Sequence, residues 1–578
     1  MSRLLATFGV LTVASTLVAA VPHPIVRLLP GPVDTTPTLD VSGRSDGTAG
    51  SGAIGATDPG ELIDFSLVLR LPGRADLEQY LDALHDPSAA EYRHFLAPEE
   101  FGARFGVADD ALARVREWIA SVGLTESEAF PQRTSIVLRG TIGAVSSLFH
   151  VRFSDFVDAQ SGRVFHAPDR DPVVPAEIAD SVEGVAGLTN RPPASARPLP
   201  GTTFAVPEGG LGPENLAAAY HITPLYDRGI HGEGQTVAVV SFDTYLDSDI
   251  AAFDEEYGIE GPPVERVDVQ GGVPDSPGQA AGEVTLDLTV VRAVAPQAQI
   301  LNYEAPYEVS QASIINAIVA DRRADIVTDS YGVCYAPEYV SEDDRRDGLQ
   351  ALESAVSAGV SVLVASGDWG AYDCWTFDPS DHRLSVDWPS STPFTVAVGG
   401  TYLSVREDGT YLSEAGWEDY LEVGGTGGGL NPLDARPDWQ HGPGVDNEFS
   451  DGMRQSPDVA ATADTDTGYT VYFTDPFSGE SGFSQFGGTS ASSPFWAGSL
   501  ALIRQLAERE GVGPLGFVNP MLYDIAESEP ASTVFHDVTR GGNLFHNATP
   551  GWDYATGLGS PDVALLGRAV VEYLTARR

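Results

Sequence analysis

The sequence predicts an α/β fold in which a parallel sheet is covered by helices and preceded by a smaller α+β domain. From residue 236 onward, short apolar runs alternate with longer helical patterns, which is typical of a parallel sheet between helical layers. Residues 61–190 mix strands and helices without that alternation. A Pro-rich stretch at 191–201 separates the two parts and has the composition of an exposed linker.

Each expected element follows from its own pattern of apolar residues. In the smaller domain we expect strands at 67–71, 134–139 and 164–166 and helices at 75–84 and 111–122. In the larger domain we expect strands at 236–241, 300–303, 325–328 and 361–365 and helices at 283–294, 311–320, 348–358 and 495–506. A functional site is expected at the carboxyl ends of the parallel strands.

The charge balance excludes two classes of partner. Asp and Glu number 82 against 33 Lys and Arg, the formal net charge is -49, and lysine is absent. A surface this acidic repels nucleic acid and anionic membranes. The acidity suits high salt or low pH, and a GC-rich genome is an alternative explanation for the loss of lysine.

The first twenty residues have the pattern of a signal peptide, with Arg3, an apolar stretch and a small-residue cleavage site at Ala19 and Ala20. A membrane anchor is the alternative, but Thr and Ser interrupt the stretch. We therefore expect a secreted, extracellular protein with a flexible leader at 21–60. Cys334 and Cys374 are the only cysteines, and they either form one bridge or remain free thiols.

The strongest local signal is a Gly-rich turn, Gly487-Gly488-Thr489-Ser490, directly before an apolar helix. Such a turn exposes the Ser490 hydroxyl beside main-chain NH groups that can stabilise an anion. Alternatively, Thr489 or Ser490 only caps the helix. None of the eleven histidines lies at a helix start as a subtilisin-type base requires; His231, for example, precedes a strand.

Two carboxylate residues are candidates for the base that histidine does not supply. Glu283 and Asp287 are four residues apart on a predicted helix and share one face, and two like charges that close raise the pKa of one group. A solvated helix face is the alternative, although the flanking residues are apolar. Asp368 follows a strand in a Gly-flanked loop. It can donate a hydrogen bond only when protonated, or it is an ordinary turn residue.

Together these pieces resemble the sedolisin family, the serine-carboxyl peptidases. The resemblance implies four catalytic residues: Ser490 as nucleophile, Glu283 as general base, Asp287 as its partner and Asp368 as the acid that stabilises the oxyanion. It also implies a subtilisin-like catalytic domain at 212–578, an activation pro-domain at 61–190 and a linker with a processing site at 191–211. The segments 330–332 and 424–429 resemble the substrate-cleft loops of the family.

The C-terminal segment resembles the calcium site of the same family. The implied ligands are the side chains of Asp537 and Asp553 and the carbonyl groups of Val538, Thr549 and Gly551, a donor set that suits a hard cation. Many relatives have Gly where Thr549 stands. Two turn aspartates without a cation are the alternative.

The implied function is a secreted, acid-acting serine endopeptidase made as a self-processing precursor. Its expected partners are protein and peptide substrates and its own pro-domain as inhibitor; we expect a monomer without nucleic-acid or stable membrane partners. Three alternatives stay open. They are a tripeptidyl-peptidase of the same family, a subtilisin-type peptidase using Asp243, and an inactive calcium-dependent binding protein.

Overall fold

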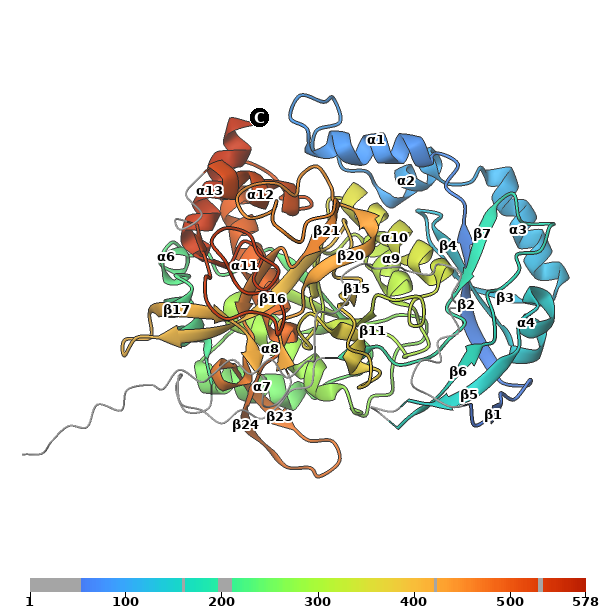
Figure 1. Cartoon of the computed structure of the whole chain (residues 1–578), viewed down its shortest axis with the longest axis horizontal. Helices are drawn as coiled ribbons and strands as arrows, with labels where there is room; N and C mark the ends of the chain where they lie inside the picture. The colour runs from blue at the N-terminus through green and yellow to red at the C-terminus, as the bar shows by residue number, and fades with distance from the viewer. Residues whose placement is uncertain (1–52, 159–161, 196–209, 420–423, 529–533, 578) are drawn as a thin grey trace, which may run out of the picture. The chain divides into compact units, whose positions relative to one another are not determined.

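The computed structural model describes residues 53–158, 162–195, 210–419, 424–528 and 534–577, and Figure 1 shows their helices and strands. The expected signal peptide lies outside the described residues, as do most of the expected leader and most of the linker. Within the described ranges, no helix is long and apolar enough to cross a membrane.

Residues 210–577 are built on an eight-stranded sheet. The strand order is β10-β11-β9-β12-β14-β16-β17, which begins with β10 (Glu265–Asp268) at one edge, and β22 (Val459–Thr462) pairs with β16 (Val396–Val405). The strands expected from the sequence are β9 (Thr236–Ser241), β11 (Gln299–Glu304), β12 (Ile326–Asp329) and β14 (Ser361–Ala365). These four are parallel, while β17 (Tyr411–Gly416) runs antiparallel to β16 at one edge.

Alternate residues of each parallel strand face opposite helical layers. Val237 and Val239 of β9 belong to the apolar cluster that includes α8 (Ala281–Val294) and α11 (Thr489–Arg509). Ala238 and Val240 belong to a second cluster with α9 (Gln311–Asp321) and α10 (Glu342–Ser357). Because both faces of the strands are buried, their sequences are continuously apolar. The predicted α/β class is confirmed.

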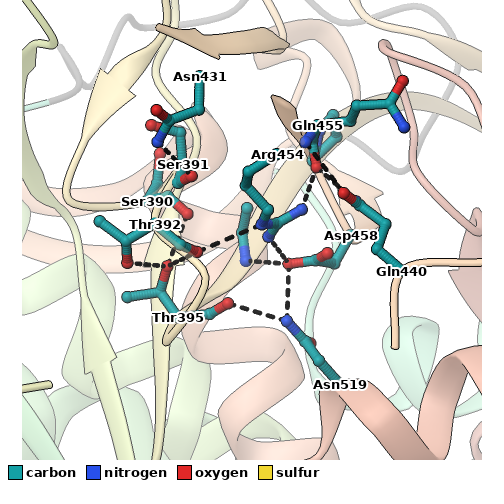
Figure 2. Close-up of polar contacts among 12 residues, drawn as sticks. Ser390, Ser391, Thr392, Thr395, Asn431, Gln440, Arg454, Gln455, Asp458 and Asn519 are labelled. Carbon is teal, nitrogen blue, oxygen red and sulfur yellow. Dashed lines mark hydrogen bonds and ion pairs between the residues drawn. The ribbon is translucent and has the colours of Figure 1, made fainter. Parts of the chain in front are cut away.

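A buried polar cluster connects the start of strand β16 with the segments around it (Figure 2). Arg454 Nη2 lies 2.6 Å from Asp458 Oδ2, and both side chains are 0% exposed. Asp458 also accepts hydrogen bonds from the Ala397 amide, Asn519 Nδ2 and the Tyr523 hydroxyl, at 2.8, 3.0 and 2.9 Å. These bonds connect β16 and β21 (Met453–Ser456) with α12 (Asn519–Ser528).

Residues 53–195 contain a four-stranded antiparallel sheet with the order β3-β4-β2-β7 and a second, three-stranded sheet with the order β1-β5-β6. The expected elements are present as β2 (Leu62–Leu69), α1 (Arg74–His85), α3 (Asp109–Ser121), β4 (Ser135–Thr141) and β6 (Val164–Pro168). The other strands are β1 (Gly55–Ala56), β3 (Thr125–Ala129), β5 (Phe153–Val157) and β7 (Val182–Ala186). Strand β2 begins five residues before the predicted start because Leu62 pairs with Thr141 of β4.

Helix α10 of the C-terminal region contacts β2, β7 and α1 of the N-terminal region. Arg74 forms two 2.6 Å hydrogen bonds with Glu353, and the Val185 amide donates to Asp343 at 2.9 Å. The helix begins at Glu342 rather than at 348 because the Ser341 side chain accepts a hydrogen bond from the Asp344 amide and caps it. Its first turn is polar because it serves this contact, so an apolar pattern could not locate it.

Candidate active site

The start of α11 presents Ser490. Gly488, the residue before the helix, has φ of +100°, a conformation that favours glycine. Inside the helix, Pro494 has no amide hydrogen to donate to the carbonyl group of Ser490 four residues earlier. That carbonyl instead accepts the Ser330 hydroxyl at 3.3 Å. The candidate nucleophile is thus in the first turn of the helix, one residue after its start at Thr489, with the positive end of the helix dipole beside it.

Helix α8 carries Glu283 and Asp287 into the interior, and every residue of this helix is buried. The segment before the helix is held by Asp243, whose carboxylate accepts the amides of Gly278 and Ala280, both at 2.9 Å. It also accepts the amide of Thr244 at 2.8 Å. Asp243, the alternative triad member, is thus engaged with main-chain groups and positions α8.

The two carboxyls and two serines form one buried group. Ser330 Oγ donates to Asp287 Oδ1 at 2.9 Å, so Ser330 connects Asp287 with the main chain of Ser490. The Ser490 hydroxyl is close enough to Glu283 to favour its charged form. Among the described residues, however, neither Glu283 oxygen nor Ser490 Oγ makes a hydrogen bond of standard geometry.

Burial disfavours the ionised form of both carboxyls in this pair. The pKa of Glu283 is raised well above its ordinary value, first by burial and then by the charge of Asp287, while the Ser490 and Ser330 hydroxyls oppose the rise. Burial also raises the pKa of Asp287 well above its ordinary value, against the Ser330 hydrogen bond. A proton is therefore retained within the pair over a wide pH range.

Asp368 lies beside the start of α11, where both the amide and the hydroxyl of Thr489 donate to its Oδ1 at 2.8 Å. Its side chain keeps a partly exposed surface. Enough protein surrounds it, however, that burial raises its pKa to about 6, against the two Thr489 hydrogen bonds. Its charge also contributes to the raised pKa of Glu283. The structure thus brings Glu283, Asp287, Asp368 and Ser490 together.

Sequence reasoning missed three further buried acids near Asp368 and Asp287. Burial raises the pKa of Asp329 to about 7. The pKa of Asp373 also rises to about 7, through burial and the charge of Asp368. The pKa of Asp387 is raised well above its ordinary value by burial and by the charge of Asp373. Nothing in their local sequence separates these acids from the other carboxylates of this chain.

Comparisons with known proteins give the family. Residues 49–191 match the pro-kumamolisin activation domain, and residues 271–514 match the subtilase family. Kumamolisin of Bacillus sp. (strain MN-32) is 33% identical over 534 residues, which cover 86% of this chain and 90% of that protein. The chain belongs to the sedolisin family.

Other family members are similar over most of their length. Sedolisin of Pseudomonas sp. (strain 101) is 28% identical and is covered to 87%, with 88% of this chain. Tripeptidyl-peptidase 1 of Homo sapiens is 27% identical and is covered to 92%, with 89% of this chain. The structure of Pseudomonas sedolisin, a serine-carboxyl proteinase complexed with pseudo-iodotyrostatin, has a TM-score of 0.54 at 27% identity and covers 64% of this chain and 99% of that one. The chain is therefore a serine-carboxyl peptidase precursor with an activation domain.

The start of the linker pairs with the strand that follows Ser330 in this sedolisin-family fold. Strand β8 (Ala194–Ser195) runs antiparallel to β13 (Tyr331–Cys334), with Ala194 opposite Gly332 and Ser195 opposite Tyr331. On its other side β13 pairs with β15 (Asp387–Trp388). The precursor therefore places a segment of its own chain as an extended strand beside Tyr331 and Gly332, directly after Ser330.

The two cysteines are bridged. Cys334 at the end of β13 and Cys374 in the short helix η1 (Asp373–Thr376) form a disulfide, with Cα atoms 4.8 Å apart. The bridge ties the segment that follows Asp368 to the strand that pairs with β8. Of the two possibilities left open by the sequence, the structure has the bridge.

The implied calcium ligands come from two segments, 537–538 and 549–553, that are joined by a hydrogen bond. The Gly551 amide donates to Asp537 Oδ1 at 3.1 Å, and the Thr549 amide donates to Asp553 Oδ2 at 2.8 Å. Burial raises the pKa of Asp537 and brings that of Asp553 to about 7. The buried carboxylate of Asp553 and the half-buried carboxylate of Asp537, beside main-chain carbonyls, suit a hard cation. No cluster of three His, Cys, Asp or Glu side chains suited to a metal occurs among the described residues, so the set depends on the carbonyl groups of Val538, Thr549 and Gly551.

Proposed function

We propose that this chain is a secreted, acid-acting serine endopeptidase that processes its own precursor. The observation that carries the proposal is the convergence of Glu283, Asp287 and Asp368 on Ser490, with the pKa of each carboxyl raised. The N-terminal export pattern and the acidic composition support secretion and acid action.

In the proposed mechanism Glu283 takes the proton of Ser490 as the hydroxyl oxygen attacks the peptide carbonyl. Asp287, held by Ser330, carries the proton that the pair already retains, which leaves Glu283 charged to receive the proton of Ser490. Asp368 acts in its protonated form and donates to the oxyanion. Its pKa of about 6 means that this donor is present in acid and is lost as the pH rises through 6. Glu283 then returns its proton to the leaving amine, and water releases the acyl group.

The pairing of β8 with β13 supports endopeptidase action and inhibition by the pro-domain. A strand added to the edge of the cleft is how extended peptides bind many proteins. Here that strand is an internal segment with a whole domain on its N-terminal side, so this part of the cleft accepts a chain that continues beyond three residues. The same segment occupies the place of a substrate until the linker is cut.

We propose that the turns at Asp537 and Asp553 hold one structural calcium ion through the five implied ligands. The ion would offset the cost of burying the two carboxylates and would fix the C-terminal turns. The test is thermal unfolding of the precursor with calcium and with a chelator. We expect the melting temperature to fall on chelation by an amount equivalent to about 2–3 kcal/mol. The Asp553→Asn variant should lose this difference.

The function is tested by acidifying the full-length precursor, sequencing the new N-terminus, and digesting two peptides that differ only in an acetylated N-terminus. We expect self-cleavage in acid and hydrolysis of both peptides. Release of tripeptides from the free peptide alone would assign tripeptidyl-peptidase action. A precursor of the Ser490→Ala variant that still matures would contradict self-processing. Failure to cleave any denatured protein after removal of the pro-domain would favour a binding protein.

A further inference from the structure

Arg191 lies at the start of the linker, and its side chain is only 6% exposed. Its guanidinium carbon lies 4.9 Å from the centre of the Tyr339 ring and 5.0 Å from that of Phe377. Phe165 of the pro-domain is a third ring at 5.4 Å, and Asp158 Oδ2 lies 3.7 Å from Arg191 Nε. A cation within about 6 Å of a ring centre is attracted to the face of the ring.

Two of these rings belong to the catalytic domain and stay with it when the pro-domain leaves. The centres of Tyr339 and Phe377 are 4.8 Å apart. Both lie in the apolar cluster that contains Cys334 and Cys374. The disulfide joins β13 to the short helix directly before Phe377. The ring pair is therefore fixed by a covalent connection and does not depend on the linker for its position.

Tyr339 of the ring pair also lines a cavity next to β13, the strand that pairs with β8. Arg191, Pro193 and Tyr339 line the same cavity as Asp329 and Trp388. Trp388 belongs to β15, which pairs with β13. Ala194, which follows Arg191 by three residues, lies opposite Gly332 of β13. A side chain in contact with the two rings thus belongs to a chain that continues along β13 toward Ser490.

We infer that Tyr339 and Phe377 form a subsite for a positively charged side chain, filled by Arg191 in the precursor and by an arginine or lysine of the substrate in the mature enzyme. The inference rests on the proposed function, because it requires substrate to lie on β13 as β8 does. The register places the basic residue three positions before the residue opposite Gly332.

Aromatic rings suit this task in an enzyme that works in acid. Carboxylates lose their charge as the pH falls, whereas the attraction of a ring for a cation does not depend on protonation. The nearby acids Glu338 and Asp381 are paired with Arg383, at 3.2 and 2.9 Å. Burial raises the pKa of Tyr339 to about 12, so its ring stays neutral. The subsite therefore keeps its selectivity where Asp368 is protonated.

The test is a cleavage profile of the enzyme matured from the full-length precursor, using a library of peptides from denatured proteins. In the wild type we expect Arg and Lys to be enriched roughly threefold to tenfold at one position on the N-terminal side of the cut. The Tyr339→Leu and Phe377→Leu variants should reduce this enrichment to background and leave other positions unchanged. Tyr339→Phe is the matched control, since it keeps the ring and loses a hydroxyl without a standard hydrogen bond in the described structure.

A second measurement needs no variant. Two synthetic peptides that carry arginine or the neutral isostere citrulline at that position should differ roughly threefold to tenfold in kcat/KM with the wild-type enzyme. Equal rates, equal enrichment in the leucine variants, or enrichment that vanishes below about pH 4, where carboxylates are protonated, would each overturn the subsite. Absence of any hydrolysis would overturn the proposed function, and the subsite with it.

Discussion

Two groups of buried polar residues in the catalytic domain are satisfied in opposite ways. Asp458 accepts hydrogen bonds from the Ala397 amide, Arg454, Asn519 and Tyr523, and Figure 2 shows those from Arg454 and Asn519. Glu283 is equally buried, yet among the described residues neither of its oxygens has a partner of standard geometry. Its nearest charged neighbours are other acids. One group contains a paired charge, and the other contains carboxyls that repel one another.

The difference separates an acid that holds the fold together from acids that can exchange protons. A buried carboxylate with a full set of donors is fixed in its charged form, and removing a donor leaves a costly unpaired charge. A buried carboxyl without donors keeps its proton longer and can take or give one at little cost in rearrangement. In the described structure the unpartnered Glu283 thus lies beside Ser490, whereas the fully partnered Asp458 belongs to the scaffold.

The largest expected effect comes from neutralising the general base. Glu283→Gln should lower kcat/KM by roughly 10³-fold or more, because proton removal from Ser490 no longer has an acceptor. It should also leave the precursor uncut in acid. The melting temperature should stay the same or rise, since a neutral amide is cheaper to bury than a carboxylate. Gel analysis of maturation and peptide kinetics measure the two effects.

Glu304→Gln is the control for that variant. Glu304 is also buried, but it accepts hydrogen bonds from Thr244 and Asn302, both at 2.9 Å. We expect this precursor to mature in acid as the wild type does. If Glu283→Gln matured equally well, Glu283 would not be the base, and the contrast between the two groups would lose its functional meaning.

Disrupting the hydrogen-bonded group around Asp458 should lower the stability of the fold more than the catalytic activity. Arg454→Met leaves Asp458 buried with a charge that has lost its cation, and we expect a loss of about 3–5 kcal/mol in unfolding free energy. Chemical denaturation and the yield of folded precursor measure it. Arg436→Met removes the partner of the exposed Asp446 and should change stability by less than about 1 kcal/mol. Similar losses in both variants would contradict the structural role given to the Arg454 pair.

Asp368 gives a third test, through the pH profile. Asp368→Ala should lower kcat/KM in acid by roughly 10²–10³-fold, the usual cost of losing one oxyanion donor. Asp368→Asn keeps a donor at every pH, so it should lose less activity. With pKa about 6 for the wild-type group, the donor is present below pH 6 and lost above it. The asparagine variant should therefore keep its activity to higher pH, and an unchanged profile would exclude Asp368 as the donor.

The sequence predicted the elements and the partners that lie close together along the chain. The spacing of Glu283 and Asp287 and the Gly-rich turn before Ser490 are local patterns, and the structure brings these residues together. Ser330 was recognised only as part of a cleft loop, because its contact with Asp287 joins residues 43 positions apart. Asp373 and Asp387 were missed for the same reason. In a chain with 82 acids, only the fold reveals which carboxyls are buried together.

Asp347 on α10 is an unpartnered buried acid outside the catalytic group. Neither of its oxygens makes a standard hydrogen bond among the described residues. The hydroxyl of Ser135, in the pro-domain, is close enough to favour its charged form. Burial nevertheless raises its pKa from 3.8 to about 7. Its stabilising contribution is therefore fully present below about pH 4 and is lost as the pH rises through 7.

The Asp347→Asn variant, made in a Ser490→Ala precursor so that no cleavage intervenes, tests this direction. At about pH 7.5 we expect the variant to be more stable by roughly 1–3 kcal/mol, and near pH 4 the difference should vanish. Thermal unfolding at both pH values measures it, with the exposed Glu342→Gln as control. A variant that is less stable at both would contradict the raised pKa. If the prediction holds, acid strengthens this contact with the pro-domain, so Asp347 is not the group whose protonation releases the pro-domain at low pH.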